Sequence, residues 1–100
     1  MVLPYDHVAT FDDLKEAARL EGFGLVVRAI TAIENAYTPD GVNMGANLGK
    51  GAGAGIPDHL HVHVVPRWDG DTNFMTTVGG VRVLPESLDS TLERLRSAFV

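Results

Sequence analysis

The stretch His59-Leu60-His61-Val62-His63-Val64-Val65-Pro66 decides how this 100-residue sequence is interpreted. Three of the four histidines of the chain alternate in it with apolar residues. Side chains of a β-strand alternate between its two faces, so the pattern predicts a strand over 59–66 that ends at the proline. The three imidazoles then share one face of this strand, and the apolar side chains share the other face, where they can close a core.

A row of three imidazoles suits nucleophilic and acid–base chemistry near neutral pH. One ring can attack through one nitrogen if an acceptor, such as a backbone carbonyl, holds the N–H of the other nitrogen. Its neighbours can stabilise phosphate oxygens or a leaving group. The loop before the strand has glycine at every second position from 49 to 55, and backbone N–H groups of such a loop can approach an anion closely. Together, loop and histidines predict phosphate chemistry.

A histidine-ligated metal site is a second interpretation of the same row. Histidines at i and i+2 of a strand can both bind zinc, and Asp58 or His7 could complete the ligand set. The glycine loop and Pro66-Arg67 favour a phosphate over a cation. A third interpretation is a half-buried strand without function, although three adjacent imidazoles gain little from packing.

The rest of the sequence predicts two amphipathic helices and a few strands, and therefore an α+β domain. Thr10 is typical of a helix N-cap, and apolar residues recur every three or four positions up to Tyr37, which predicts a helix over 10–37. Further strands are predicted at 2–3 and 42–48, with a weak extended segment at 75–83. A last helix is predicted to begin at Pro85 and to turn a row of leucines towards the core.

Composition limits the class of protein. One hundred residues, 45% of them hydrophobic and 21% charged, are typical of one globular domain, here residues 1–100. Thirteen acidic against eight basic residues give a net charge of −5, which disfavours a nucleic-acid or anionic-membrane surface. The sequence has no apolar run of the roughly 18 residues that a membrane span needs, no secretory signal and no cysteine, so we expect a cytoplasmic protein without disulfides.

Several of these motifs resemble the histidine-triad family. Its hallmark, His-apolar-His-apolar-His followed by two apolar residues, is present at residues 59–65. Pro4-Tyr5-Asp6-His7 is similar to the earlier Pro-x-x-His element of the family. Asn47-Leu48-Gly49 with the glycine loop, and Val65-Pro66-Arg67-Trp68, are similar to the actinobacterial diadenosine-polyphosphate branch. The resemblance covers residue 2 to about residue 99.

The resemblance implies a mostly antiparallel α+β fold and a nucleotide hydrolase or phosphorylase that needs no metal or cofactor. His61 would attack the α-phosphorus and form a nucleotidyl-histidine intermediate, which water or orthophosphate would resolve. His59 and His63 would flank this nucleophile, and His7 would support the row from behind. The implied phosphate contacts are Asn47, Gly53 and Gly55.

The substrate and the assembly stay open within this resemblance. Dinucleoside polyphosphates, with adenine as the base, are implied by the branch, and nucleoside phosphoramidates are the alternative within the family. The family's N-terminal strands have no counterpart before Val2, so we expect a shortened domain with an exposed sheet edge and apolar face, which favours a homodimer. A nucleotide-binding or dimerising module without catalysis is a further alternative.

Residues around the histidine row receive weaker expectations. Lys50 and Arg67 are expected to be surface charges, either of which could also contact a phosphate. Trp68 is expected to pack rather than to contact a ligand. Asp69 and Asp71 are interpreted as turn residues only.

Overall fold

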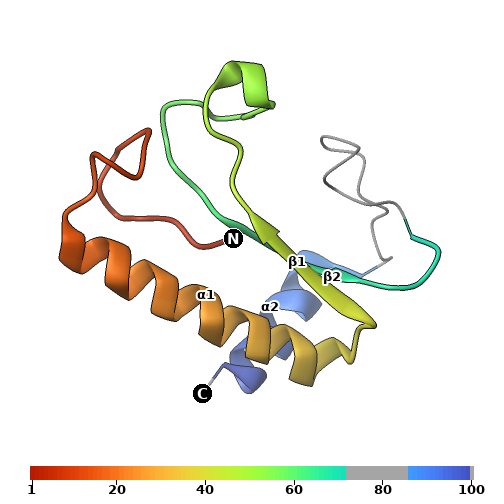
Figure 1. Ribbon diagram of the computed structural model, residues 1–100. Coiled ribbons are helices and arrows are strands. Elements are labelled where there is room, and N and C mark those ends of the chain that lie inside the picture. The colour runs from red at the N-terminus through yellow and green to blue at the C-terminus, as the bar shows by residue number, and fades with distance from the viewer. Residues whose placement is uncertain (72–85, 100) are drawn as a thin grey trace. The chain divides into compact units, whose positions relative to one another are not determined.

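The computed structural model describes residues 1–71 and 86–99 (Figure 1). The order of elements is α1 (Glu16–Tyr37), β1 (Gly41–Gly45), the short 3-10 helix η1 (Lys50–Ala52), β2 (His63–Arg67) and α2 (Leu88–Ala98). This content confirms the predicted α+β class. The extended segment predicted at 75–83 and the helix start predicted at Pro85 lie outside the described residues.

Helix α1 begins six residues later than predicted. Thr10 closes a separate turn, in which the Asp13 N–H donates to Thr10 Oγ1 (3.3 Å) and the Thr10 hydroxyl donates to Asp13 Oδ2 (2.9 Å). The Leu14 N–H continues this turn by donating to the Phe11 carbonyl, and the Leu14 side chain is buried. The N-cap expectation for Thr10 was therefore wrong, because its hydroxyl serves a turn that precedes the helix. The predicted end at Tyr37 is confirmed.

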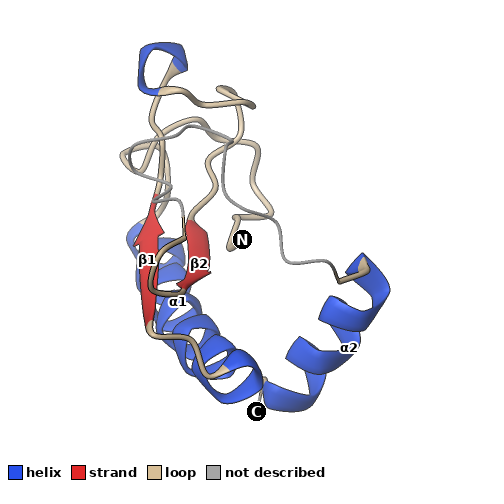
Figure 2. Cartoon of the chain, turned by 90° about the vertical axis from the view of Figure 1, so that its right-hand side faces the viewer, coloured by secondary structure: helices blue, strands red, loops and turns tan. Residues whose placement is uncertain are grey.

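Strands β1 and β2 run antiparallel as neighbours in one sheet (Figure 2). The strand predicted over 59–66 is only partly formed, since β2 begins at His63 and continues through Pro66 to Arg67. Before it, Val62 forms an isolated antiparallel bridge with Val2, with N–H···O bonds of 2.8 and 2.9 Å in both directions. The Leu60 N–H donates to the Val8 carbonyl (2.7 Å). Residues 59–62 are thus held by the N-terminal segment of the chain.

Contacts divide the chain into two compact units. The first contains residues 1–27 and 44–64, and the second contains residues 28–43 and the described residues from 65 onward. Leu14, Val26 and Leu60 are buried in the first unit, which also has an open apolar pocket of about 580 Å³ lined by Val2 and Val62 among others. The burial of Leu60 confirms for this residue the prediction that apolar side chains between the histidines help to close a core, whereas Val62 is half-buried.

The second unit joins the C-terminal half of α1 to α2 through polar side chains. Glu86 accepts hydrogen bonds from the Tyr37 hydroxyl (2.6 Å) and the Thr91 hydroxyl (2.7 Å) and forms an ion pair with Arg94 (3.3 Å). The Arg94 guanidinium also lies over the Tyr37 ring, and that of Arg28 lies over the Phe99 ring.

Helix α2 begins one residue after its N-cap, Ser87, whose Oγ accepts from the Ser90 N–H (3.1 Å). The helix buries none of its side chains: Leu88 is 88% exposed and Leu92 is 49% exposed. The expected core-facing row of leucines was therefore wrong for these two residues. In the described ranges, no helix has the length and apolar character to cross a membrane.

Candidate active site

The four histidines form two ring pairs within the first compact unit. The rings of His7 and His59 have centroids 4.9 Å apart, and those of His61 and His63 have centroids 4.8 Å apart and are nearly perpendicular. His7 comes from the N-terminal segment, whereas the other three follow one another along the partly paired stretch that leads into β2. The rings of the row are half-buried and His7 is exposed. The structure thus gathers all four predicted histidines.

The orientation of the His61 ring is set by a hydrogen bond to the backbone carbonyl two residues earlier in the chain. His61 Nδ1 lies 3.0 Å from the carbonyl oxygen of His59. A carbonyl oxygen only accepts hydrogen bonds, so Nδ1 must carry the hydrogen. In the neutral ring the lone pair then resides on Nε2. This is the arrangement that a nucleophilic imidazole requires.

His59 is held in a similar way by a different carbonyl. Its Nε2 lies 3.1 Å from the carbonyl oxygen of Pro4 and therefore donates to it. This contact connects the Pro-x-x-His element to the histidine row, because Pro4 binds His59 while His7 stacks beside it. The N-terminal segment thus orients one flank of the row.

His63 is biased towards its neutral form. Burial of the ring lowers its pKa below the ordinary value of 6.5, and the charges of His61 and of the chain's N-terminus lower it further. At neutral pH this imidazole can therefore accept a proton or a hydrogen bond beside His61.

The glycine loop before the histidine row has fewer backbone N–H groups available to a phosphate than its sequence suggests. Gly49 and Gly53 have positive φ angles of 81° and 89°, which close η1 tightly. The Gly53 N–H donates to the Lys50 carbonyl (3.0 Å), and the Ala54 N–H donates to the Gly49 carbonyl (3.2 Å). A phosphate oxygen at Gly53 would have to replace its bond to Lys50.

The other two predicted phosphate contacts lie on either side of η1. Asn47 is half-buried between β1 and η1, and Gly55 is exposed after η1. Within the described part of the chain, Asn47 forms no hydrogen bond with any of the four histidines. The structure therefore does not join Asn47 to the histidine row directly.

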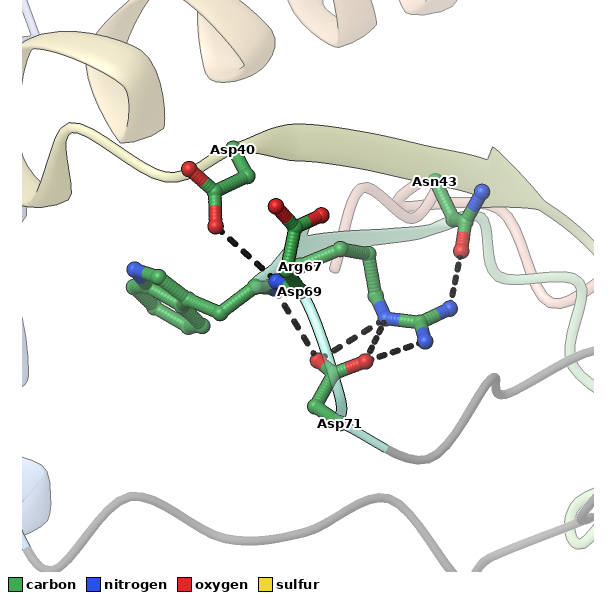
Figure 3. Close-up of polar contacts among 6 residues, drawn as sticks. Asp40, Asn43, Arg67, Asp69 and Asp71 are labelled. Carbon is green, nitrogen blue, oxygen red and sulfur yellow. Dashed lines mark hydrogen bonds and ion pairs between the residues drawn. The ribbon is translucent and has the colours of Figure 1, made fainter.

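Arg67 is not the surface charge that was expected. Its side chain is only 15% exposed, and its guanidinium donates to Asp71 and to Asn43 Oδ1 (Figure 3). Asn43 and Asp71 were not among the predicted site residues. An Arg and an Asp four residues apart around Gly70 are the one sequence signal that could have indicated the Asp71 pair. Trp68 is half-buried, as a packing residue would be.

The geometry gives the metal interpretation no ligand set. Over residues 1–71 and 86–99, no group of three or more His, Asp or Glu side chains is arranged to hold a metal ion. Asp58 is exposed. What the site presents is a row of imidazoles in which two rings have defined donor nitrogens.

Comparison with known proteins identifies the family. Residues 1–70 match the model of the HIT domain, so the chain belongs to the HIT (histidine triad) family, as the motifs predicted. Over 99 residues the chain is 46% identical to the AP-4-A phosphorylase of Mycobacterium tuberculosis, which covers 99% of this chain and 51% of that protein. An uncharacterised HIT-like protein of Saccharolobus solfataricus is 33% identical over 76 residues, or 53% of its length. The chain thus spans about half the length of these curated relatives.

Solved structures support the same family at the level of the fold. A hypothetical histidine triad nucleotide-binding protein of Sulfolobus tokodaii superposes with a TM-score of 0.73 and 27% identity over 97% of this chain and 66% of that one. A zinc-bound histidine triad family protein of Mycobacterium smegmatis superposes with a TM-score of 0.71 and 28% identity, over 97% of this chain and 65% of the other. The predicted HIT-like α+β fold is therefore confirmed.

Proposed function

We propose that this chain cleaves dinucleoside polyphosphates through a nucleotidyl intermediate on His61. The observation that carries the proposal is the His61 Nδ1–His59 carbonyl contact of 3.0 Å, which leaves the lone pair on Nε2. The similarity to a protein named AP-4-A phosphorylase supports this class of substrate and favours orthophosphate as the acceptor.

The reaction has two steps that balance at phosphorus. His61 Nε2 forms a bond to the α-phosphorus, and the bond from that phosphorus to its bridging oxygen breaks, so the remaining nucleoside polyphosphate leaves as an anion. An oxygen of orthophosphate then attacks the same phosphorus, and the N–P electron pair returns to Nε2. The second product is a nucleoside diphosphate, whereas attack by water would give a nucleoside monophosphate and a proton.

The other predicted site residues take supporting roles in this proposal. His59 and His63 flank the nucleophile and contact phosphate oxygens or the leaving group, and His7 supports the His59 ring. The side chain of Asn47 and the backbone N–H of Gly55 hold the phosphates, together with the Gly53 N–H once a phosphate oxygen replaces its bond to the Lys50 carbonyl.

The test is a turnover assay with diadenosine tetraphosphate in the presence of a chelator, with and without orthophosphate. We expect adenosine diphosphate as a product with orthophosphate, and a loss of about a thousandfold or more in His61→Ala. The matched control is His7→Ala, which should retain more activity than His61→Ala because it removes a supporting ring. Equal activity of His61→Ala and the unchanged protein would refute the nucleophile.

We further propose that both compact units form one HIT domain over residues 1–100. The family match to residues 1–70 includes parts of both units, and α1, β1 and β2 each contribute residues to both. A single cooperative unfolding transition, seen with the same midpoint by Trp68 fluorescence and by helical circular dichroism, is expected.

A homodimer is proposed through the outward face of α1. Ala17, Leu20, Gly24 and Val27 follow a heptad spacing there, and Leu20 and Val27 are 69% and 49% exposed. Among the described residues beyond the adjacent backbone of α1, no atom lies within 4 Å of the position of a Cβ at Gly24, so a second helix could approach closely. In an antiparallel pair, the exposed Glu21 and Arg28 beside this seam would face each other with opposite charges.

Light scattering after size-exclusion chromatography tests this face. We expect a dimer that Leu20→Glu converts to a monomer, and we expect Leu88→Glu, at an even more exposed leucine of α2, to leave the mass unchanged. A monomeric unchanged protein would refute the proposal.

A further inference from the structure

Each nitrogen of the Arg67 guanidinium has a partner near the end of β2. Its Nε donates to both carboxylate oxygens of Asp71 (2.9 Å each), its second terminal nitrogen also pairs with Asp71, and its first donates to Asn43 Oδ1 (2.6 Å). Figure 3 shows Arg67 between the Asn43 side chain on β1 and the Asp71 side chain on the following turn. Every nitrogen of the guanidinium thus has a partner within the chain.

The turn after β2 is attached to β1 at a second point. The Asp69 N–H donates to Asp40 Oδ2 (2.9 Å), and Asp40 directly precedes β1. Asp71 also accepts from the Trp68 N–H (3.2 Å), which closes the turn from within. We call the set Asp40, Asn43, Arg67, Asp69 and Asp71 the β1–β2 staple.

The two strands lack the feature that normally fixes the register of a pair. A buried face sets register, because a slip of one residue moves every side chain to the opposite face. Neither strand contains a buried residue, β1 has glycine at both ends, and each strand has only five residues. A short two-stranded ribbon is only marginally stable by itself. A side-chain connection between the strands can therefore decide their register.

We infer that Arg67, with Asn43 and Asp71, is a positioning residue that fixes the register of β2 and thereby the side on which His63 projects, an inference that rests on the proposed function. β2 begins with His63 and ends with Arg67, so both side chains belong to one five-residue strand. Because the Val62 backbone is held separately by Val2, a slip of β2 by one residue at the Arg67 end would turn His63 away from its 4.8 Å contact with His61. The same contacts use an N–H group on each of the three guanidinium nitrogens for bonds within the chain.

The experiment compares four variants of the full chain in the phosphorolysis of diadenosine tetraphosphate. Asn43→Leu removes the acceptor at nearly constant size, Asn43→Asp retains it, Arg67→Met removes the guanidinium, and Arg96→Met is the matched control at an exposed arginine of α2. We expect Asn43→Leu and Arg67→Met to lower kcat by about ten- to a hundredfold with little change in KM. Asn43→Asp and Arg96→Met should retain kcat within about twofold.

The imidazole resonances of His63 provide a readout that does not depend on turnover. In Asn43→Leu they should shift, together with the cross-strand contacts between β1 and β2, while those of His7 stay in place. If the unchanged protein has no activity, the proposed function fails. The His63 resonances alone then test whether the β1–β2 staple positions His63. Unshifted His63 resonances in Asn43→Leu, or a raised KM at unchanged kcat in Arg67→Met, would overturn the inference.

Discussion

The two compact units differ in how they hold their polar side chains. In the first unit, His59 and His61 are each held by a backbone carbonyl, those of Pro4 and His59 respectively, around an apolar core. In the second unit, Arg67 and Glu86 are held by other side chains, each through several contacts. The first unit anchors its functional groups with main chain, and the second with side chains.

This difference determines which groups remain available for chemistry. A carbonyl occupies one nitrogen of an imidazole and leaves the other for a substrate. A carboxylate and an amide around a guanidinium occupy all of its nitrogens, as at Arg67. Arg67, which was expected to be a surface charge, is therefore held within the chain, whereas His59 and His61 each keep one ring nitrogen outside these carbonyl contacts. Four experiments can break or sharpen this contrast.

The largest effect on stability is expected from Leu60→Ala in the first unit. Leu60 is 5% exposed and lies between His59 and His61 in the sequence, so its truncation removes core packing from the segment that carries both rings. We expect a loss of about 2–5 kcal/mol in the free energy of unfolding, measured in urea. Leu88→Ala, at a leucine that is 88% exposed, should change it by less than about 0.5 kcal/mol. Equal losses of unfolding free energy in the two variants would mean that Leu60 contributes no core packing to the segment that carries the histidine row.

A smaller effect is expected from Tyr37→Phe in the second unit. The substitution removes the hydroxyl that donates to Glu86, at a cost of about 1 kcal/mol for a partly exposed bond. Hydrogen exchange should show this loss of protection at the α2 amides. Unchanged protection of α2 in Tyr37→Phe would contradict a stabilising Tyr37–Glu86 bond.

The same variant has a defined pH signature. Burial and the bond to Glu86 raise the pKa of Tyr37 above 10.0, so the unfolded chain releases this proton first and stability falls as pH rises through 10.0. The bonds from Tyr37 and Thr91 lower the pKa of Glu86 below 4.5, so stability falls again as pH drops through 4.5. In Tyr37→Phe, the loss of stability above pH 10.0 and the loss below pH 4.5 should both be smaller. A dependence of stability on pH that parallels that of the unchanged protein would contradict the Tyr37–Glu86 bond.

The smallest effect is expected at His63. Because burial lowers its pKa in the folded state, the unfolded chain binds the proton first as pH falls through 6.5, and stability decreases below that pH. The difference in unfolding free energy between His63→Gln and the unchanged protein should therefore shift in favour of the variant between pH 7.5 and pH 5.5. A difference that does not change over this range would show that the ring is not shielded.

The class of the fold and the histidine row could be predicted because both rest on local patterns. Alternation of histidine with apolar residues correctly indicated that Leu60 is buried, and apolar spacing correctly indicated the end of α1 at Tyr37. The start of α1 was missed because Thr10 can cap a turn as well as a helix, and only the burial of Leu14 decides between them. Boundaries depend on such tertiary contacts.

The partners of Arg67 could not be predicted for a different reason. Asn43 lies 24 residues before it, and nothing in the sequence around Asn43 signals a bond to a distant guanidinium. The carbonyl of Pro4 that holds His59 is 55 residues away, and a backbone acceptor has no sequence signature at all. Contacts of this range follow from the fold, so the structure is needed to show which ring nitrogen of His59 and of His61 is bound to a carbonyl.

The central claim is that His61 Nε2 forms a covalent bond to phosphorus, and intact-mass analysis tests it most directly. The unchanged chain and His61→Ala are incubated with diadenosine tetraphosphate in a chelator without orthophosphate, then quenched above pH 8, because a phosphoramidate bond hydrolyses in acid. We predict one added adenylyl group on the unchanged chain, located on His61 by peptide mapping, and none on His61→Ala. An adduct of the same mass on His61→Ala, or turnover by the unchanged chain through a bond to another residue, would contradict the account.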